Sequence, residues 1–182
     1  VLSDWGQGHW CASLLIKIAE KDMRINAPAI RQAGWGKGTN DAFLVSLLSE
    51  AYAIPTDYKP ENELVDPYRE LLRAWRTSDQ AIFREAMRAA AEFHVSRSKD
   101  GTDRNKYEFE KDFDRVFPGE LLAVQALRRR DGLPELETGH LLVDTPWSIL
   151  RDLPVCEPHP LAVAREARLR RDAPECRVVK GD

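Results

Sequence analysis

The segment from Phe117 to Gly132, FPGELLAVQALRRRDG, is apolar on nearly every side when it is placed on a helical wheel. Before its three final arginines, Glu120 and Gln125 are the chief polar residues among leucine, alanine and valine. A helix that is apolar all round belongs inside a core, because no face of it gains from contact with water. The rest of the chain must therefore fold around this segment, with Pro118 beginning it.

Arg128, Arg129 and Arg130 fall in the last turn of this predicted helix. Cations there interact favourably with the negative end of the helix dipole, by about 0.3–1 kcal/mol each when exposed. Gly132 stands where a left-handed residue commonly ends a helix. The alternative is a nucleic-acid patch, but a single basic turn without aromatic residues and with acidic neighbours is a weak candidate. We therefore expect an exposed helix end.

Helical spacing of apolar residues recurs along most of the chain, and strand patterns are nearly absent apart from the ambiguous HLLVD at 140–144. Besides the apolar segment, the spacing predicts helices over 8–20, 27–32, 39–53, 66–76, 79–97, 107–117, 146–150 and 160–171. Segments 66–76 and 79–97 carry facing apolar stripes around a short break, so we expect them to pack as an antiparallel hairpin.

The fold class that follows is all-α: an irregular multi-helix bundle or an array of helical hairpins. One domain is expected over 1–182, since this length suits a single core. Its parts are N-terminal helices in 1–53, a central helical core in 66–131 and a proline-punctuated C-terminal part in 133–182.

Composition excludes several functional classes. With 43 % hydrophobic and 31 % charged residues the chain is an ordinary soluble globule, and its net charge of −3 argues against general attraction to nucleic acid or anionic lipid. No apolar run approaches the ~18 residues of a spanning helix, and the first residues lack the order of a signal peptide. Three scattered cysteines favour a reducing compartment, so a cytoplasmic location is expected.

Metal and phosphate motifs are weak. Cys156 and His159 have a ligand-like spacing but no second pair nearby, and His9 with Cys11 is no better, so no zinc site is predicted. The glycine-rich GWGKG at 34–38 lacks a Ser or Thr directly after Lys37 and follows no strand, so it does not predict a phosphate cradle. No cofactor is expected.

Catalytic motifs are absent as well, since no nucleophile elbow or dinucleotide fingerprint occurs. His94 ends the apolar stripe of its helix, where a structural role is the simpler interpretation. Glu110 and Asp114 could face each other across one helical turn, as any solvated pair of acids can. A small helical enzyme built from His94, His140 and Glu110 remains an alternative, and a helical adaptor or scaffold is another.

The loop IPTDYKPENELVD, residues 54–66, is the most unusual surface candidate, because two prolines hold it off the helices and acids surround an aromatic residue. Loops carry binding functions disproportionately, and clustered acids favour encounter with a basic partner. The predicted partner-binding residues are Tyr58, Glu61, Glu63 and Asp66. Segment 100–114 is a second acidic, aromatic stretch, and a merely solubilising surface is the alternative for both.

Three segments together resemble a known family: SDQAIFREAMRAAAEFH ending at His94, FPGELLAVQAL at 117–127 and DTPWSILRDLP at 144–154. They are similar to helical immunity proteins of bacterial polymorphic-toxin and contact-delivered systems such as type VI secretion, in particular immunity protein family 49. The likeness covers about half the chain, and the N-terminal third departs from it. It implies a cytoplasmic, non-enzymatic, all-helical protein that binds a cognate toxin and blocks its active site. The acids of the loop favour a toxin with a basic active-site cleft, and no cofactor, nucleic acid or membrane partner is expected.

Overall fold

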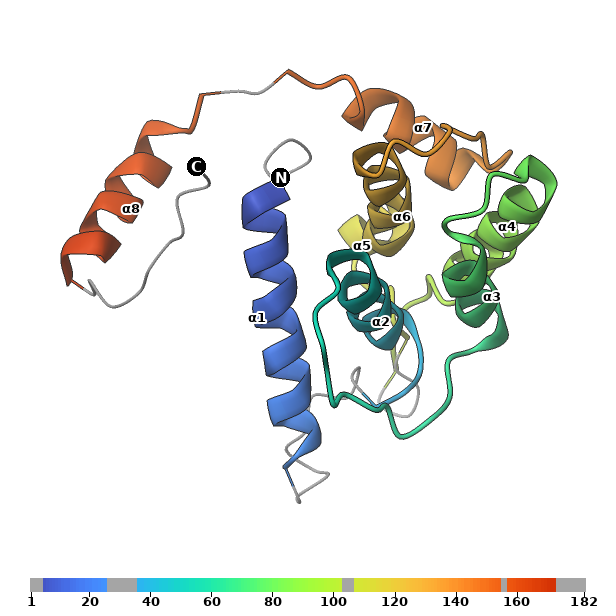
Figure 1. Ribbon diagram of the computed structural model, residues 1–182, viewed down its shortest axis with the longest axis horizontal. Coiled ribbons are helices and arrows are strands. Elements are labelled where there is room, and N and C mark those ends of the chain that lie inside the picture. The colour runs from blue at the N-terminus through green and yellow to red at the C-terminus, as the bar shows by residue number, and fades with distance from the viewer. Residues whose placement is uncertain (1–4, 26–35, 103–106, 155–156, 173–182) are drawn as a thin grey trace.

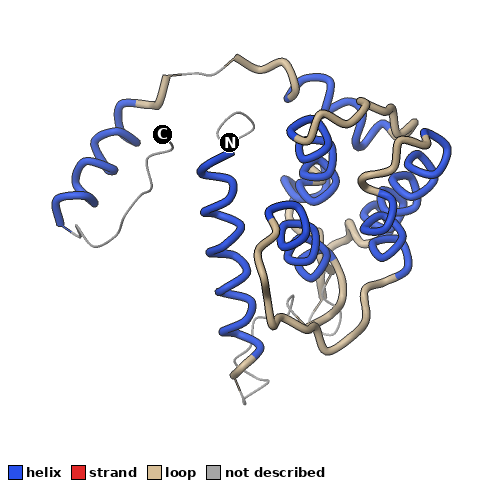
Figure 2. The backbone as a smooth tube through the Cα atoms, viewed as in Figure 1, coloured by secondary structure: helices blue, strands red, loops and turns tan. Residues whose placement is uncertain are grey.

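The computed structural model in Figure 1 describes residues 5–25, 36–102, 107–154 and 157–172. Within these residues the chain folds into helices and loops and contains no strand, which confirms the predicted all-α fold (Figure 2). The helices are α1 (Trp5–Met23), α2 (Asn40–Tyr52), α3 (Asp66–Ala74), α4 (Gln80–Ser96), α5 (Asp112–Val116), α6 (Gly119–Arg130), α7 (Leu141–Leu150) and α8 (Pro160–Asp172). None of them combines the length and the apolar character needed to cross a membrane.

Helix α6 is the core helix that its composition predicts. It packs against α2, α4 and α7, and Leu121 and Val124 are completely buried in the main apolar cluster. Phe43 of α2, Leu71 of α3 and Met87 of α4 belong to the same cluster. Burial of each such side chain contributes about 1.5–3 kcal/mol, so this cluster is the main source of stability.

Helices α3 and α4 form the predicted hairpin and pack against each other more extensively than any other pair. Residues 75–79 separate them, and Asp79 caps α4 by accepting hydrogen bonds from the amides of Ala81 at 2.8 Å and Ile82 at 3.1 Å. The break and the cap explain why one apolar pattern becomes two helices instead of one.

A smaller apolar cluster joins α1 to the rest of the molecule. Ile16 and Ala19 of α1 meet Val45 of α2 and Tyr58 of the following loop. Glu20 accepts hydrogen bonds from the Thr56 hydroxyl at 2.6 Å and from the backbone amide of residue 57 at 3.0 Å. The second cluster therefore anchors the start of the acidic loop to α1.

The arginine triplet differs from its predicted role, because its first member is inside the protein. Arg128 is only 1 % exposed, and its guanidinium donates to the backbone carbonyls of Trp75 at 2.6 Å, Thr77 at 2.9 Å and Pro134 at 2.9 Å. It also lies 4.2 Å from the centroid of the Phe83 ring, and burial lowers the pKa of its guanidinium. The expectation of an entirely exposed helix end was wrong for this residue.

The other two arginines lie nearer the surface and also make structural contacts. Arg129 donates to the carbonyl of Arg151 at 2.5 Å, joining α6 to the end of α7. Arg130 donates to the carbonyl of Ala51 at 2.7 Å and lies 4.5 Å from the centroid of the Tyr52 ring. The three arginines at the end of α6 thus make specific contacts with four neighbouring segments, at residues 51–52, 75–77, 134 and 151.

Two predicted elements need correction, and a third lies outside the described residues. Of the helix predicted over 107–117, only Asp112–Val116 is helical, as α5. Residues 107–111 are not helical, and this places the Phe109 side chain in a buried position. The ambiguous HLLVD begins helix α7, which continues through Pro146. The short helix predicted over 27–32 falls outside the described ranges.

Replacing Arg128 with glutamine is expected to lower the free energy of unfolding by about 2–4 kcal/mol, since three buried carbonyls lose their donor. The matched change Arg129→Gln, one residue along on the exposed side, should cost less than about 1 kcal/mol. Urea unfolding followed by circular dichroism measures both values. Equal costs for the two variants would contradict the structural role given to Arg128.

Candidate functional site

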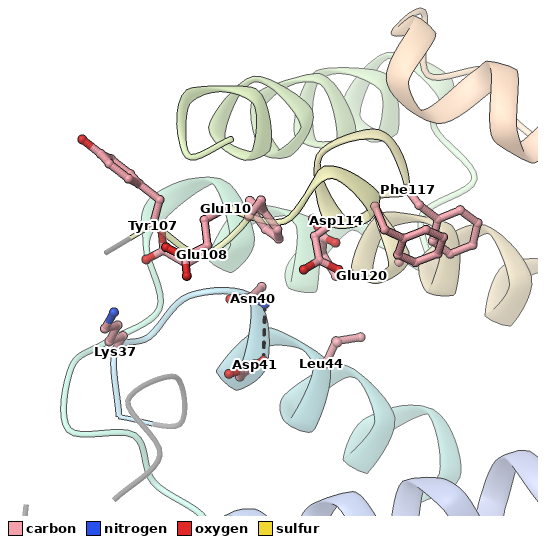
Figure 3. Close-up of a pocket in the computed structure, with 13 residues that line it drawn as sticks. Lys37, Asn40, Asp41, Leu44, Tyr107, Glu108, Glu110, Asp114, Phe117 and Glu120 are labelled. Atoms are coloured by element: carbon pink, nitrogen blue, oxygen red, sulfur yellow. Dashed lines mark hydrogen bonds between the residues drawn. The ribbon is translucent and has the colours of Figure 1, made fainter. Parts of the chain in front are cut away.

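An acidic pocket of about 650 Å³ lies between the start of α2, residues 107–114 and the start of α6 (Figure 3). Its lining contains five carboxylate side chains against one cation, Lys37. The carboxylates are those of Asp41, Glu108, Glu110, Asp114 and Glu120. We call this site the acidic pocket. Its lining comes from segments far apart in the sequence, so no local sequence motif predicts this pocket.

The deepest wall of the pocket is a buried polar cluster around Glu120, in the first turn of α6. Its Oε1 lies 2.7 Å from Nδ1 of His94 and accepts a hydrogen bond from the Tyr68 hydroxyl at 3.1 Å. Burial, followed by the nearby charge of Glu120, raises the pKa of Tyr68 well above its ordinary value, so its hydroxyl stays protonated. One carboxylate therefore joins α3, α4 and α6.

The partners of His94 fix where its hydrogens lie. Its Nε2 is 2.9 Å from the backbone carbonyl of Asp114, which can only accept, so this nitrogen carries a hydrogen. Nδ1 then either donates to the Glu120 carboxylate or accepts from its acid form. In both cases the His94–Glu120 pair holds one shared proton and has no net charge, and neither ring nitrogen is open to a substrate.

The segment that covers this cluster is held by ring stacking and an ion pair. The Phe109 ring stacks on the His94 ring with centroids 3.6 Å apart. Arg97, the residue after α4, pairs with Glu108, its Nε lying 2.5 Å from Oε2, and its guanidinium is 4.8 Å from the centroid of Tyr107. These contacts explain why residues 107–111 are not helical, although their sequence predicts a helix.

Asp41 forms the opposite wall, in the first turn of α2. Burial raises the pKa of its carboxyl, the nearby charge of Lys37 lowers it and that of Glu108 raises it. A carboxylate that is partly stripped of water and beside a like charge gains from an added cation. A cation in the pocket would therefore favour the charged form of Asp41.

The rim of the pocket is aromatic, with the ring of Phe113 exposed and that of Phe117 half-buried. The rings of Phe113 and Phe117 stack with centroids 5.0 Å apart, and Phe113 is 65 % exposed. Val116 beside them is also exposed. Large apolar side chains of this kind next to a polar floor are typical of a surface that another molecule covers.

The four predicted partner-binding residues do not form one exposed group. Glu61, Glu63 and Asp66 are exposed in the loop, and Asp66 forms an ion pair with Arg69. Tyr58 instead points inward, is 8 % exposed and belongs to the second apolar cluster. Burial, followed by the charge of Asp41, raises its pKa to about 12. The ring of Tyr58 therefore anchors the acidic loop to α1 and α2 by apolar packing.

The loop is joined to the pocket through residues 36–38. The amides of Asn62 and Val65 donate to the carbonyls of Gly36 at 3.0 Å and Gly38 at 2.9 Å. Gly38 has a φ of +71°, and a Cβ on it would lie 2.1 Å from the Glu63 carbonyl oxygen, so this position requires glycine. The described part of GWGKG thus aligns the acidic loop beside Lys37 on the pocket wall.

The residues of the enzyme alternative have separate structural roles. His140 caps α7, its Nδ1 accepting from the Leu142 amide at 3.2 Å. Glu110 precedes α5 and therefore does not face Asp114 across a helical turn, although both acids line the pocket. Sequence reasoning missed Asp41 and Glu120, because each is an isolated acid at the start of a largely apolar helix and belongs to no local motif. The available signal was Glu120 itself, an acid at the start of a core helix.

Of the weak metal-ligand pair, Cys156 and His159, the described residues include only His159. Cys156 lies outside the described ranges, and His159 caps α8 by accepting from the Leu161 amide at 3.1 Å. Nowhere in the described residues is a group of three or more His, Cys, Asp or Glu side chains placed to hold a metal ion. Cys11 is the cysteine that the described ranges contain, and its thiol is free and exposed.

Comparisons of the chain with protein-family models, curated protein sequences and solved structures find no significant match.

Replacing Glu120 with leucine should lower the free energy of unfolding by about 2–4 kcal/mol, because His94 and Tyr68 lose a buried acceptor. Glu110→Leu is the matched control, since it alters another acid of the same pocket that is exposed. Its cost should stay within about 0.5 kcal/mol. Thermal and urea unfolding of the two variants measure both costs. A negligible cost for Glu120→Leu would mean that the buried cluster does not stabilise the fold.

The raised pKa of Tyr58 predicts an alkaline effect on stability. The unfolded chain ionises near pH 10 and the folded one near pH 12, so the contribution of this group is complete below pH 10 and disappears as the pH rises to 12. We expect its loss to amount to about 2 kcal/mol, after discounting for partial solvent access. Unfolding of the wild-type chain and Tyr58→Phe between these limits measures it. The stability of the wild-type chain should fall relative to that of Tyr58→Phe as the pH rises, and parallel curves would contradict the inward packing of Tyr58.

Proposed function

We propose that this chain is a helical immunity protein, which binds a cognate bacterial toxin and blocks its active site without itself being a catalyst. The observation that carries the proposal is the acidic pocket with its exposed aromatic rim. Exposed aromatic side chains around a desolvated polar centre are typical of energetically important protein contacts. The sequence resemblance to helical immunity proteins then gives the class of partner.

The charge of this side of the molecule favours a basic partner. The acidic loop adjoins the pocket through residues 36–38, so Glu61 and Glu63 extend the negative surface beyond the pocket lining. Negative surfaces accelerate association with basic ones and set the orientation of encounter. A toxin that acts on nucleic acids or nucleotides offers such a basic cleft, so this toxin class is the preferred partner.

The two alternatives account less well for the pocket. Catalysis by His94 would need a ring nitrogen open to substrate, whereas both of its ring nitrogens are bound inside the protein. An adaptor or scaffold could use the same surface, but it would neutralise no toxic activity. Co-expression therefore separates the proposals: the toxin encoded beside this chain should stop growth alone and be harmless when this chain is present.

Reversing the charge of the loop, with Glu61→Lys, Glu63→Lys and Asp66→Lys together, should weaken toxin binding at least about tenfold, mainly by slowing association. The control carries the same charge change on exposed acids elsewhere, at Glu85, Glu137 and Glu157. Association rates at two salt concentrations, together with growth protection, provide the measurement. Undiminished protection by the folded loop variant would exclude the loop as the electrostatic anchor and leave the pocket to carry the contact.

A further inference from the structure

Two deeply placed carboxylates of the acidic pocket each keep one oxygen without a protein partner. Glu120 uses Oε1 for both His94 and Tyr68, and Glu108 uses Oε2 for Arg97. Within the described part of the chain, Oε2 of Glu120 and Oε1 of Glu108 accept no hydrogen bond, yet neither atom is sealed from solvent. Both residues line the pocket and their side chains are only 4 % and 6 % exposed, so the pocket is the opening through which we infer that these oxygens reach solvent.

The charges around the pocket leave a deficit of cations. Five lining carboxylates face Lys37, Arg97 and the single proton that His94 and Glu120 share, so two negative charges remain. Arg115 offsets at most one of them: its guanidinium donates to the Asp100 carboxylate at 2.5 Å and to the backbone carbonyl of Glu110 at 2.7 Å, and it also interacts electrostatically with the Glu110 carboxylate. Asp41 and Asp114 are half-buried and partly shielded from water, so a cation entering the pocket would be stabilised by their charge.

We infer that the acidic pocket binds a guanidinium group, supplied by an arginine side chain of the protein partner. The inference rests on the proposed function for its polypeptide source, whereas the chemistry follows from the open oxygens and the rings around them. A guanidinium is planar and carries five donors, which suits several carboxylate oxygens that converge from different walls. An ammonium is a compact charge and would leave more of these acceptors unused.

The aromatic rim favours the same group. Guanidinium planes stack on aromatic faces, and Arg97 already lies over Tyr107 at the edge of this pocket. Phe113 offers a second face that is open to solvent. A volume of about 650 Å³ is within the usual range of roughly 300–1,000 Å³ for ligand pockets and exceeds what one guanidinium fills. The remaining space and the rim would accommodate the residues on either side of the arginine.

The test uses the full chain, labelled with ¹⁵N, and a capped Gly-Arg-Gly peptide as the probe. A small ligand of this size should bind with a Kd of about 1 mM. We expect amide shifts concentrated at Asp41, Glu110 and Phe113. The matching lysine peptide should bind at least about threefold more weakly, and the neutral citrulline peptide should cause no shifts at these positions.

Two variants connect the binding to the pocket. Asp41→Asn with Asp114→Asn should weaken the arginine peptide at least about tenfold, because both changes remove charge from the walls. Phe113→Ala alters an exposed ring, leaves the fold intact and should also weaken it. The control, Glu85→Gln with Glu137→Gln, removes the same charge from exposed positions outside the pocket lining and should bind as the wild type does.

Several outcomes would overturn the inference: no shifts, shifts away from the pocket, equal binding of the arginine and lysine peptides, or unchanged binding by the pocket variants. Methylguanidinium is the probe for the other possible source. If it binds as tightly as the peptide, the site takes a free small cation and the polypeptide source is wrong. Toxin protection is measured in a separate experiment. Protection without peptide binding would reject the guanidinium site and keep the proposed function, and peptide binding without protection would do the reverse.

Discussion

The buried carboxylate of Glu120 is the interaction on which the rest of the structure depends. An acid at the start of an apolar helix must find donors, and these come from Tyr68 on α3 and His94 on α4. His94 in turn binds the carbonyl of Asp114, which places the chain before α6 over the cluster. The same contacts that satisfy one buried group therefore create the wall of the acidic pocket.

The other end of α6 is fixed by a second buried polar group. Arg128 donates to carbonyls at the turn between α3 and α4 and to Pro134, so both ends of this apolar helix contact the same hairpin. Apolar burial supplies most of the stability of such a core but has little directional preference. Hydrogen bonds to Glu120 and Arg128 fix the position of the helix along and around its axis, because a shift would leave buried donors and acceptors unpaired.

The sequence predicts the helices well and the site poorly, for one physical reason. Helical periodicity is local, so α1, α2, the α3–α4 hairpin and the core helix α6 follow from spacing and caps. The pocket depends on contacts between distant segments, such as His94 with Glu120 and Arg97 with Glu108, which no spacing predicts. The same long-range contacts override the helical pattern of residues 107–111. They also explain why Tyr58, in an acidic loop, packs inward while its neighbours stay exposed.

We propose that the acidic pocket and its rim form the contact with a protein partner. Amide hydrogen exchange of the chain, free and in complex with the proposed toxin partner, tests this most directly. We expect binding to slow exchange mainly in residues 107–120 and around Asp41, with smaller effects in the loop before α3. Slowed exchange confined to the outer face of α1 or to α7 and α8, with the pocket unchanged, would contradict it.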